Sequence, residues 1–400
     1  MTEDLVKSLG RAFGGWGARD VLVGRDTRAS GVALEDALVA GLSEAGADVG
    51  RGGILPTPAV ALLAEAAGAV ISASHNPPEY NGVKFFADGG RKLTDDEEEA
   101  IEELLDMPAA NGGQVAADED AAFRYVDLVC ERFGSQLNSL RVVLDCANGA
   151  MYEVAPEAFR RANAHVAMIG NSPDGANINV GCGATDLSLL QQTVRSGDFD
   201  LGVAFDGDGD RMLAVAADGT ALDGDQILAI LALHLGVDLV AVTEMTNLGF
   251  HRLMEERGIR VITTEVGDRY VLEALRRENG LLGGEESGHI LYLDGHSSGD
   301  GLVAGLLLCR AVVESGSPLA ELAAVMPKYP QAKENVPVRS KEMPPQLRER
   351  IDELAGEGRV VVRPSGTEPV VRVLAEAESQ KAASELCVRI ATLVSRELGS

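Results

Sequence analysis

The sequence has little cysteine, few aromatic residues and no long apolar run. Its five cysteines stand singly, without the paired spacing of a disulfide framework or a zinc site, which favours reduced thiols. No apolar stretch reaches membrane-spanning length without a charge, a histidine or several glycines, and residues 1–4, with Glu3 and Asp4, are unlike a signal peptide. We therefore expect a cytoplasmic protein that has no membrane partner.

Basic residues are also in short supply. The 62 acidic and 35 basic residues give a formal net charge of −27, which argues against nucleic acid or an anionic membrane surface as a partner. If the ligand is itself an anion, a few arginine and lysine side chains must create a local positive cleft. Adaptation to high salt is a second explanation of the acidity, and the sequence leaves it open.

The glycine content and the apolar content indicate the fold class. With 46 glycines and 46% hydrophobic residues in 400, the chain fits an α/β protein of several domains. Three successive segments repeat an order of buried strand and helix, and each contains a polar loop bounded by glycine or proline. We expect three related α/β domains with mixed sheets at residues 1–136, 137–236 and 237–328, and a smaller α+β domain at residues 329–400. Because ligands bind at the carboxyl ends of such strands, the loops are predicted to line one central cleft.

The first of these loops carries a serine. An apolar run ends at Ser72, and the pair Pro77 and Pro78 then prevents further strand pairing, which places Ser74 on a loop just past a buried strand. A helix that follows Pro58 and continues through Ala67 is predicted to precede that strand. The hydroxyl of Ser74 is then presented to a ligand, and the alternative is a polar turn that satisfies backbone groups.

The second loop carries three carboxylates. Asp206, Asp208 and Asp210 alternate with glycines directly after an apolar strand, so in a roughly extended loop their side chains share one face. Three hard oxygen ligands suit Mg²⁺, and carboxylates this close repel one another unless they are neutralised, which favours a metal over a solvated turn. An EF-hand loop is excluded, because Arg211 occupies the required glycine position and Ala217 the bidentate glutamate position.

The third loop offers hydrogen-bonding groups at alternating positions. Glu285, Ser287 and His289 are suited to sugar hydroxyls, although His289 could also be a surface histidine. Lys84, behind the serine loop, could act as a general base if it is desolvated, and a solvated surface charge is the alternative.

A fourth loop, residues 363–369, has the composition of a phosphate cradle. It brings together the guanidinium of Arg363, the hydroxyls of Ser365 and Thr367, and main-chain amides exposed by Gly366. The alternative is a hydroxyl-stabilised turn with an ordinary surface arginine. The serine and aspartate loops independently call for a phosphate ligand, which favours the cradle.

With these four loops in this order, the sequence resembles the α-D-phosphohexomutase superfamily over nearly its whole length, and most of all its phosphoglucosamine mutase branch. Six further stretches carry that likeness, namely residues 71–86, 145–150, 177–179, 182–186, 223–226 and 266–270. The resemblance implies that Ser74 is the phosphoserine and that it binds Mg²⁺ together with Asp206, Asp208 and Asp210. It also implies further roles, with Arg211 bordering the metal loop, Glu285 and Ser287 binding the sugar, Arg363, Ser365, Gly366 and Thr367 binding the distal phosphate, and Lys84 and His289 as acid–base candidates.

Two features depart from the pattern of the family. The family normally begins with a strand and a Gly-Thr-x-Gly-Ile-Arg-Gly loop, and this chain begins after it. We therefore expect an unpaired edge in the first sheet and one fewer cation at the site. Glu286 stands where this branch more often has glutamine, which bears on the preference for an amino sugar.

The activity implied by the resemblance is an intramolecular phosphoryl transfer. Phosphorylated Ser74 gives its phosphoryl group to O1 of a hexosamine 6-phosphate, and the resulting 1,6-bisphosphate returns its 6-phosphoryl group, so that glucosamine 6-phosphate becomes glucosamine 1-phosphate. Mg²⁺ is the expected cofactor, a glucose or glucosamine 1,6-bisphosphate the expected activator, and monomer and homodimer both stay open. Three alternatives remain: mannose or glucose phosphates as substrates, a phosphatase that uses an aspartyl-phosphate at Asp206, and a non-catalytic sugar-phosphate binding protein.

Overall fold

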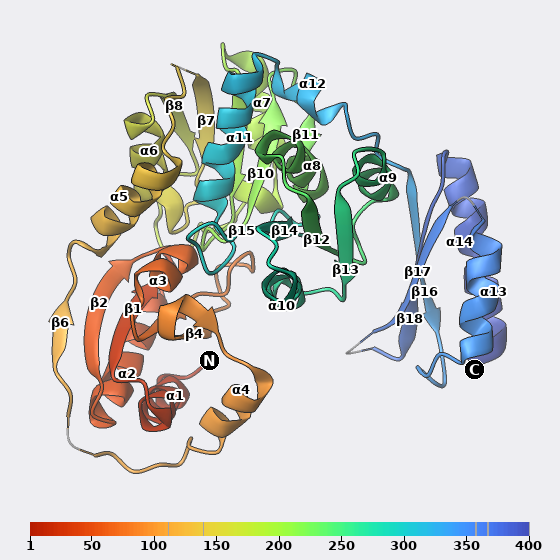
Figure 1. The fold of residues 1–400 in the computed structure, drawn as a ribbon. Helices are drawn as coiled ribbons and strands as arrows, with labels where there is room; N and C mark the ends of the chain where they lie inside the picture. Colours follow the sequence, from red (N-terminus) through yellow and green to blue (C-terminus); the bar gives the residue numbers. More distant parts are fainter. Residues whose placement is uncertain (111, 139, 357, 366–367, 400) are drawn as a thin grey trace.

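The computed structural model describes residues 1–110, 112–138, 140–356, 358–365 and 368–399. Four sheets follow one another along the chain, each with its own helices, and Figure 1 shows the four units arranged round an arch. The predicted fold class is confirmed, because three units are α/β with mixed sheets and the fourth is a smaller α+β unit. The exact domain boundaries stay predictions.

The first unit contains a six-stranded sheet in the order β5-β4-β3-β1-β2-β6. Strand β3 (Ala67–Ile71) is buried along its whole length, because Ala69 and Ile71 pack in a core with α1 and α2 while Val70 faces the core that includes α3. The other elements of this unit are α1 (Glu3–Trp16), β1 (Asp20–Arg25), α2 (Gly31–Glu44), β2 (Asp48–Ile54), α3 (Thr57–Leu63), β4 (Val83–Ala87), η1 (Asp88–Gly90), β5 (Arg91–Lys92), α4 (Asp95–Glu102), β6 (Val115–Ala117) and α5 (Ala121–Phe133).

Two expectations for this unit need comment. The helix predicted to continue through Ala67 ends at Leu63, because Ala67 pairs with Val21 as the first residue of β3. The edges of the sheet are the short strands β5 and β6, of two and three residues. Short edge strands leave few backbone groups unpaired.

The second and third units each combine three parallel strands with antiparallel strands at one edge. Their sheets have the orders β11-β10-β9-β7-β8 and β13-β12-β14-β15. The second unit comprises β7 (Arg141–Asp145), α6 (Met151–Arg161), β8 (His165–Ile169), η2 (Gly183–Thr185), α7 (Ser188–Ser196), β9 (Leu201–Phe205), β10 (Met212–Ala216) and β11 (Ala221–Leu222). The chain continues through α8 (Gly224–Leu235), β12 (Leu239–Thr243), α9 (Leu248–Glu256), β13 (Arg260–Thr264), α10 (Asp268–Glu278), β14 (Leu282–Gly284), β15 (Ile290–Tyr292), α11 (Gly301–Ser315) and α12 (Leu319–Ala323).

One apolar core extends through the first three units. Val70 of β3, Phe205 of β9, Val240 of β12 and Leu306 of α11 all belong to it. Helix α11 is apolar almost all round, which is typical of a helix with protein on every side. The three units are therefore joined by packing as well as by the chain.

The fourth unit has a core of its own. Strands β16 (Gln331–Pro337), β17 (Arg359–Pro364) and β18 (Val370–Glu376) form an antiparallel sheet in the order β16-β18-β17. Helices α13 (Pro345–Ala355) and α14 (Gln380–Leu398) cover it and complete the separate core. Within the described part of the chain, we find no helix with both the length and the apolar character needed to cross a membrane.

Candidate active site

The serine loop begins where β3 ends. Ser74 is only 8% exposed, and its hydroxyl donates a hydrogen bond of 2.6 Å to Oδ2 of Asp206, a residue 132 positions away. The side-chain amide of Asn76 donates a hydrogen bond to the carbonyl of Ala73 within the turn, as the alternative of a polar turn predicts. The side chain of Asn76 thus stabilises the turn, whereas the hydroxyl of Ser74 is directed at a carboxylate of the second unit.

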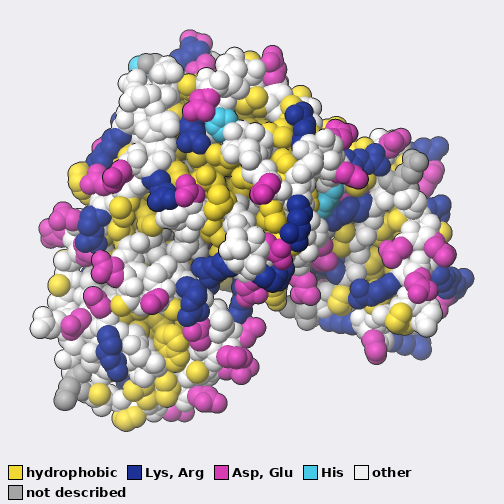
Figure 2. Space-filling view, in the orientation of Figure 1, with side chains coloured by type: hydrophobic (Ala, Val, Ile, Leu, Met, Phe, Trp, Pro, Cys, Tyr) yellow, Lys and Arg dark blue, Asp and Glu magenta, His cyan; other side chains and the backbone are white. Residues whose placement is uncertain are grey.

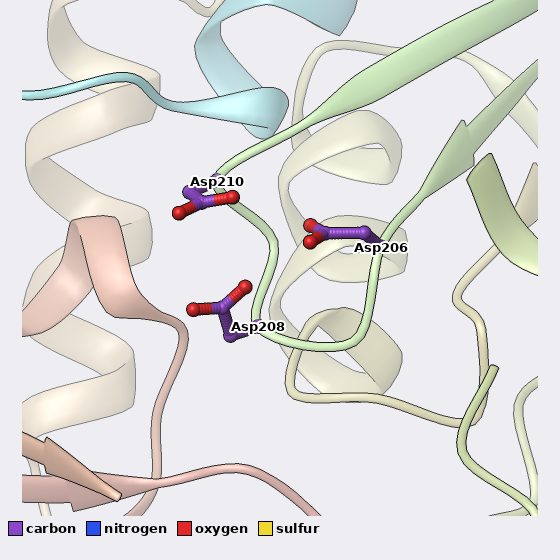
Figure 3. Close-up of side chains that lie close together, drawn as sticks. All are labelled: Asp206, Asp208 and Asp210. Carbon is purple, nitrogen blue, oxygen red and sulfur yellow. The ribbon is translucent and has the colours of Figure 1, made fainter. Parts of the chain in front are cut away.

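The aspartate loop is a tight turn, so the expectation of an extended loop is wrong. Gly209 has φ +77°, and its N–H donates to the main-chain and side-chain oxygens of Asp206. The turn brings one oxygen from each of Asp206, Asp208 and Asp210 within 4.8 Å of the others. Figure 3 shows the three side chains close together on this turn. Convergence of the carboxylates therefore comes from the glycine-permitted turn rather than from strand-like alternation.

The three carboxylates fit a cation. All three are buried, and Oδ1 of Asp208 and of Asp210 accepts no hydrogen bond from the described residues. Burial, together with the neighbouring charges of Asp210 and Asp208, raises the pKa of Asp206. Buried anionic oxygens without partners are costly, and three hard oxygens are the ligand type that Mg²⁺ prefers. The donor set thus supports the predicted metal, which Asp206, Asp208 and Asp210 would hold.

Lys84 lies against this carboxylate cluster. Its Nζ is 2.6 Å from Oδ2 of Asp208 and 3.2 Å from Oδ2 of Asp210. Burial alone would lower the pKa of Lys84, but the two carboxylates outweigh burial and raise it above its usual range. The two carboxylates therefore favour the protonated form of Lys84 in this arrangement, which argues against Lys84 as a general base.

His289 is a buried member of the same cluster and not a surface histidine. It is 4% exposed, with Nδ1 3.7 Å from Asp210 and Nε2 3.0 Å from Asp268. Burial would lower the pKa of His289, but these two carboxylates raise it to about 9. His289 therefore carries a proton at neutral pH.

A cleft of about 480 Å³ unites side chains of the first three units. Figure 2 shows Lys and Arg side chains, with Asp and Glu side chains beside them, where the first unit faces the third. Lys84, Lys92 and Arg211 bring cations to this cleft, as binding of an anion requires. The lining comprises Ala73, Ser74, His75, Asn76, Lys84, Lys92, Asp210, Arg211, Val266, Gly267, Asp268, Glu285 and His289.

The third loop, which carries Glu285, Ser287 and His289, faces this cleft through Glu285. Its Oε1 accepts the N–H of Gly267 at 3.1 Å and its Oε2 accepts the hydroxyl of Ser287 at 3.1 Å. The bonds from Gly267 and Ser287 hold the carboxylate of Glu285 in a defined orientation. Arg211 borders the aspartate loop, where its main-chain N–H donates to Asp206 Oδ1 at 3.2 Å.

The fourth loop, predicted from its composition to bind phosphate, belongs to the fourth unit and lies apart from this cluster. Ser365 is 4% exposed and its hydroxyl accepts the N–H of Glu368, while Arg363 stands on β17. Gly366 and Thr367 lie outside the described residues. Neither Arg363 nor Ser365 lines the cleft that contains Ser74.

Four further residues contact the predicted site residues or their partners, although no motif in the sequence assigned them a role. Thr57 donates its hydroxyl to Asp208 Oδ2, Lys92 pairs with Asp268, and Lys341 donates to the carbonyl of Ser365. Asp268 lies in a stretch that carried the family resemblance, so a signal for it was present. Thr57, Lys92 and Lys341 carry no local signal, because their partners are 151, 176 and 24 residues away.

Comparison with known proteins identifies the family. Profiles described as phosphoglucomutase/phosphomannomutase alpha/beta/alpha domains I, II and III match residues 1–111, 124–219 and 223–329, and the profile of the C-terminal domain matches residues 308–393. The chain belongs to this family. A phosphoglucosamine mutase of Pelotomaculum thermopropionicum is 48% identical over 399 residues, covering 94% of this chain and 90% of that one.

Two other relatives agree with that assignment. A phosphoglucosamine mutase of Bacillus subtilis is 42% identical over 430 residues, covering the whole of this chain and 96% of its own. The crystal structure of a phosphoglucomutase/phosphomannomutase family protein from Burkholderia thailandensis matches with a TM-score of 0.85 at 25% identity, covering 99% of this chain and 94% of its own. The chain is thus a phosphohexomutase, which is an isomerase.

Proposed function

We propose that this phosphohexomutase interconverts glucosamine 6-phosphate and glucosamine 1-phosphate through phosphorylated Ser74 and a 1,6-bisphosphate. The observation that carries the proposal is the 2.6 Å contact between the Ser74 hydroxyl and Asp206, inside a carboxylate cluster suited to a cation. The relatives named phosphoglucosamine mutase, at 42–48% identity over nearly the full chain, support the amino sugar as substrate. Glucose and mannose phosphates are the less favoured substrates.

The transfer has two half-reactions that mirror each other. In the first, the bond between phosphorus and Ser74 Oγ breaks while a bond to O1 of the sugar forms, and the proton of O1 is passed to Ser74 Oγ. In the second, after the bisphosphate has turned round, the bond between phosphorus and O6 breaks, Ser74 Oγ regains the phosphoryl group, and the proton of Ser74 Oγ is passed to O6. Lys84 and His289, whose protonated forms are favoured by the carboxylates around them, are the proposed groups that give a proton to the departing oxygen and recover one from the attacking hydroxyl.

Charge neutralisation dominates catalysis of this kind. Mg²⁺ held by Asp206, Asp208, Asp210 and phosphorylated Ser74 would offset the negative charge of the phosphoryl group. Arg211, Lys84 and Lys92 line the same cleft and add protein cations. A local positive clamp of this kind reconciles a net charge of −27 with an anionic substrate.

The two ends of the substrate are assigned to different units. Glu285 and Ser287 bind sugar hydroxyls, and Arg363, Ser365, Gly366 and Thr367 bind the distal phosphate. Because Arg363 and Ser365 do not line the Ser74 cleft, the fourth unit must approach it when substrate binds. Added 1,6-bisphosphate would activate the enzyme by phosphorylating Ser74.

The partners and the surroundings are part of the same proposal. The net charge argues against nucleic acid or anionic membrane partners, and the singly placed cysteines favour a reducing compartment, the cytoplasm. A homodimer is proposed as the assembly, and light scattering of the purified protein tests it.

The test combines intact mass with substrate assays. Purified protein should carry one phosphoryl group, absent from Ser74→Ala and retained in the control Ser196→Ala, an exposed serine at the end of α7. Assays with Mg²⁺ should show fastest turnover of glucosamine phosphate. Equal turnover of glucose and mannose phosphates with glucosamine phosphate inert would overturn the substrate assignment.

The stability of the phosphoryl group distinguishes the phosphatase alternative. A phosphoserine withstands hydroxylamine, whereas an acyl phosphate on Asp206 is cleaved by it. Release of the phosphate by hydroxylamine would therefore contradict the role proposed for Ser74.

A further inference from the structure

A buried arginine lies directly beneath the serine loop. Arg28 is 1% exposed, and all five of its side-chain N–H groups have acceptors. Nε donates to Oδ2 of Asp26 at 2.8 Å. The two terminal nitrogens donate to four main-chain carbonyls of the loop, at Ser74 (2.9 Å), Asn76 (2.8 Å), Tyr80 (2.8 Å) and Pro77.

A second side chain, from another unit, holds the same carbonyls. The amide of Asn179, in the loop between β8 and η2, donates to the carbonyl of Ser74 at 2.9 Å and to that of Asn76 at 3.2 Å. The carbonyl of Ser74 thus receives donors from the first and the second unit. Neither Arg28 nor Asn179 lines the cleft.

The N–H of Ser74 is held as well. It donates to Oγ of Ser72 at 2.9 Å, and the hydroxyl of Ser72 donates to Oδ2 of Asp26 at 2.6 Å. Asp26 in turn accepts the Nε–H of Arg28. Both main-chain polar groups of Ser74 are therefore tied to one buried network.

This network explains an unfavourable backbone conformation. Ser74 has φ +50°, a left-handed conformation that serine rarely adopts and that persists only where its surroundings enforce it. In that conformation the hydroxyl of Ser74 reaches Asp206 at 2.6 Å. A relaxed φ would turn the Cα–Cβ bond relative to the held main chain and move Oγ away from the carboxylate cluster.

We propose that Arg28 and Asn179 are positioning residues that hold the main chain of Ser74 so that Oγ faces the metal loop. The inference rests on the proposed function, because it concerns the nucleophile of that reaction. Phosphoryl transfer depends on alignment of the reacting oxygens, and a small displacement slows it strongly. Loss of the clamp should therefore lower kcat, while KM changes little because neither residue touches the substrate cleft.

Asn179→Gly gives the sharper test. Asn179 has φ +61°, so glycine keeps the backbone conformation and removes only the amide. The matched control is Asn163→Gly, an exposed asparagine with φ +65° just beyond α6. We expect kcat for glucosamine 6-phosphate to fall about tenfold in Asn179→Gly, with KM within about twofold, and neither to change in the control.

Arg28→Lys tests the other half of the clamp. Lysine keeps the charge but lacks the planar fork that reaches four carbonyls, so we expect about a hundredfold loss of kcat. The ³¹P resonance of phosphorylated Ser74 should shift in both variants and not in Asn163→Gly. If Arg28→Lys fails to fold, Asn179→Gly alone decides the matter.

Two readouts separate failure of this inference from failure of the proposed function. An active wild-type enzyme whose kcat and ³¹P resonance are unchanged by Asn179→Gly would overturn the inference and leave the function standing. A wild-type protein without mutase activity would overturn the function. In that case hydrogen exchange of residues 74–80 still tests the clamp, since faster exchange in Asn179→Gly than in Asn163→Gly supports it and equal exchange refutes it.

Discussion

The Ser74 cleft and the junction with the fourth unit are held together in different ways. Around the cleft, three units share one apolar core, and their charged side chains meet at 2.6 to 3.7 Å across unit boundaries. The fourth unit has a separate core, and directed polar contacts connect it to the third unit. Shared apolar packing fixes one arrangement, whereas a few polar bonds can be remade in another orientation. From this comparison we expect the Ser74 cleft to be preassembled and the fourth unit to be the part that can change its orientation.

The junction centres on one buried carboxylate, Glu376 of β18. Its Oε1 accepts from the amides of Asn247 and Gln331, and its Oε2 accepts from the N–H of Leu248 and from Arg359 at 2.9 Å. Arg359 continues across the junction to the carbonyls of Thr246 and Glu244. Every bond here is directional, so the junction specifies an orientation without a large apolar interface.

The largest expected effect removes a metal-binding carboxylate from the cleft. Asp206→Asn should lower kcat/KM for glucosamine 6-phosphate by about a thousandfold, because charge neutralisation by a cation is worth several kcal/mol. The exposed Asp238→Asn is the control and should be silent. Isothermal titration with Mg²⁺ should show weakened binding in Asp206→Asn alone, and equal binding would contradict the metal assignment.

The same substitution should act in the opposite direction on stability. In EDTA the crowded carboxylates repel one another and burial raises the pKa of Asp206, so Asp206→Asn should stabilise the fold by about 1 kcal/mol. Denaturant unfolding in EDTA measures it. If Asp206→Asn is less stable than the wild type, other groups of the protein already neutralise the repulsion between the carboxylates.

The junction should respond differently. Glu376→Gln leaves Arg359 without its charged partner and should destabilise the fourth unit by about 3 kcal/mol. Because this junction carries the phosphate loop, KM should rise while phosphorylation of Ser74 is retained. Limited proteolysis and intact mass check both points against Glu385→Gln, an exposed glutamate on α14. Loss of Ser74 phosphorylation in Glu376→Gln would break the distinction between the two regions.

Alkaline pH should weaken the cleft. The pKa of His289 is raised from 6.5 to about 9, so its protonated form stabilises the fold below pH 6.5 and that contribution is lost as pH rises through 9. In EDTA the free energy of unfolding should fall by about 3 kcal/mol between these limits. His289→Gln should remove this dependence, and a variant that keeps the full alkaline loss would refute the assignment.

Acid should weaken the junction, with the smallest expected effect. Burial and the nearby charge of Arg359 lower the pKa of His251, on α9, from 6.5 to about 4. The unfolded chain then binds the proton more readily between pH 6.5 and 4, so stability present above pH 6.5 is lost as pH falls through this range. Because His251 is only partly buried, solvent screening reduces this loss to about 2 kcal/mol. In His251→Gln the free energy of unfolding should fall less between pH 6.5 and 4. A fall as large as in the wild type would show that other groups cause it.

The local organisation was predictable because it depends on near neighbours in the chain. The apolar run before Ser74 and the proline pair after it predicted a loop past a buried strand, and β3 ends at Ile71. The glycine-separated aspartates predicted a cation site, although the reason given, an extended loop, was wrong. The end of α3 was misplaced, because pairing of Ala67 with Val21 of β1 overrides the helical pattern.

By itself the sequence determined the order of strands, helices and polar loops, since apolar periodicity, proline and glycine act within a few residues. Only the tertiary structure decided that Asp26 and Arg28 lie beneath Ser74, that Lys84 is paired with Asp208, and that the fourth unit has its own core. These partners are separated by tens to more than a hundred residues. Packing of whole units determines such distances, and no local pattern in the chain encodes them.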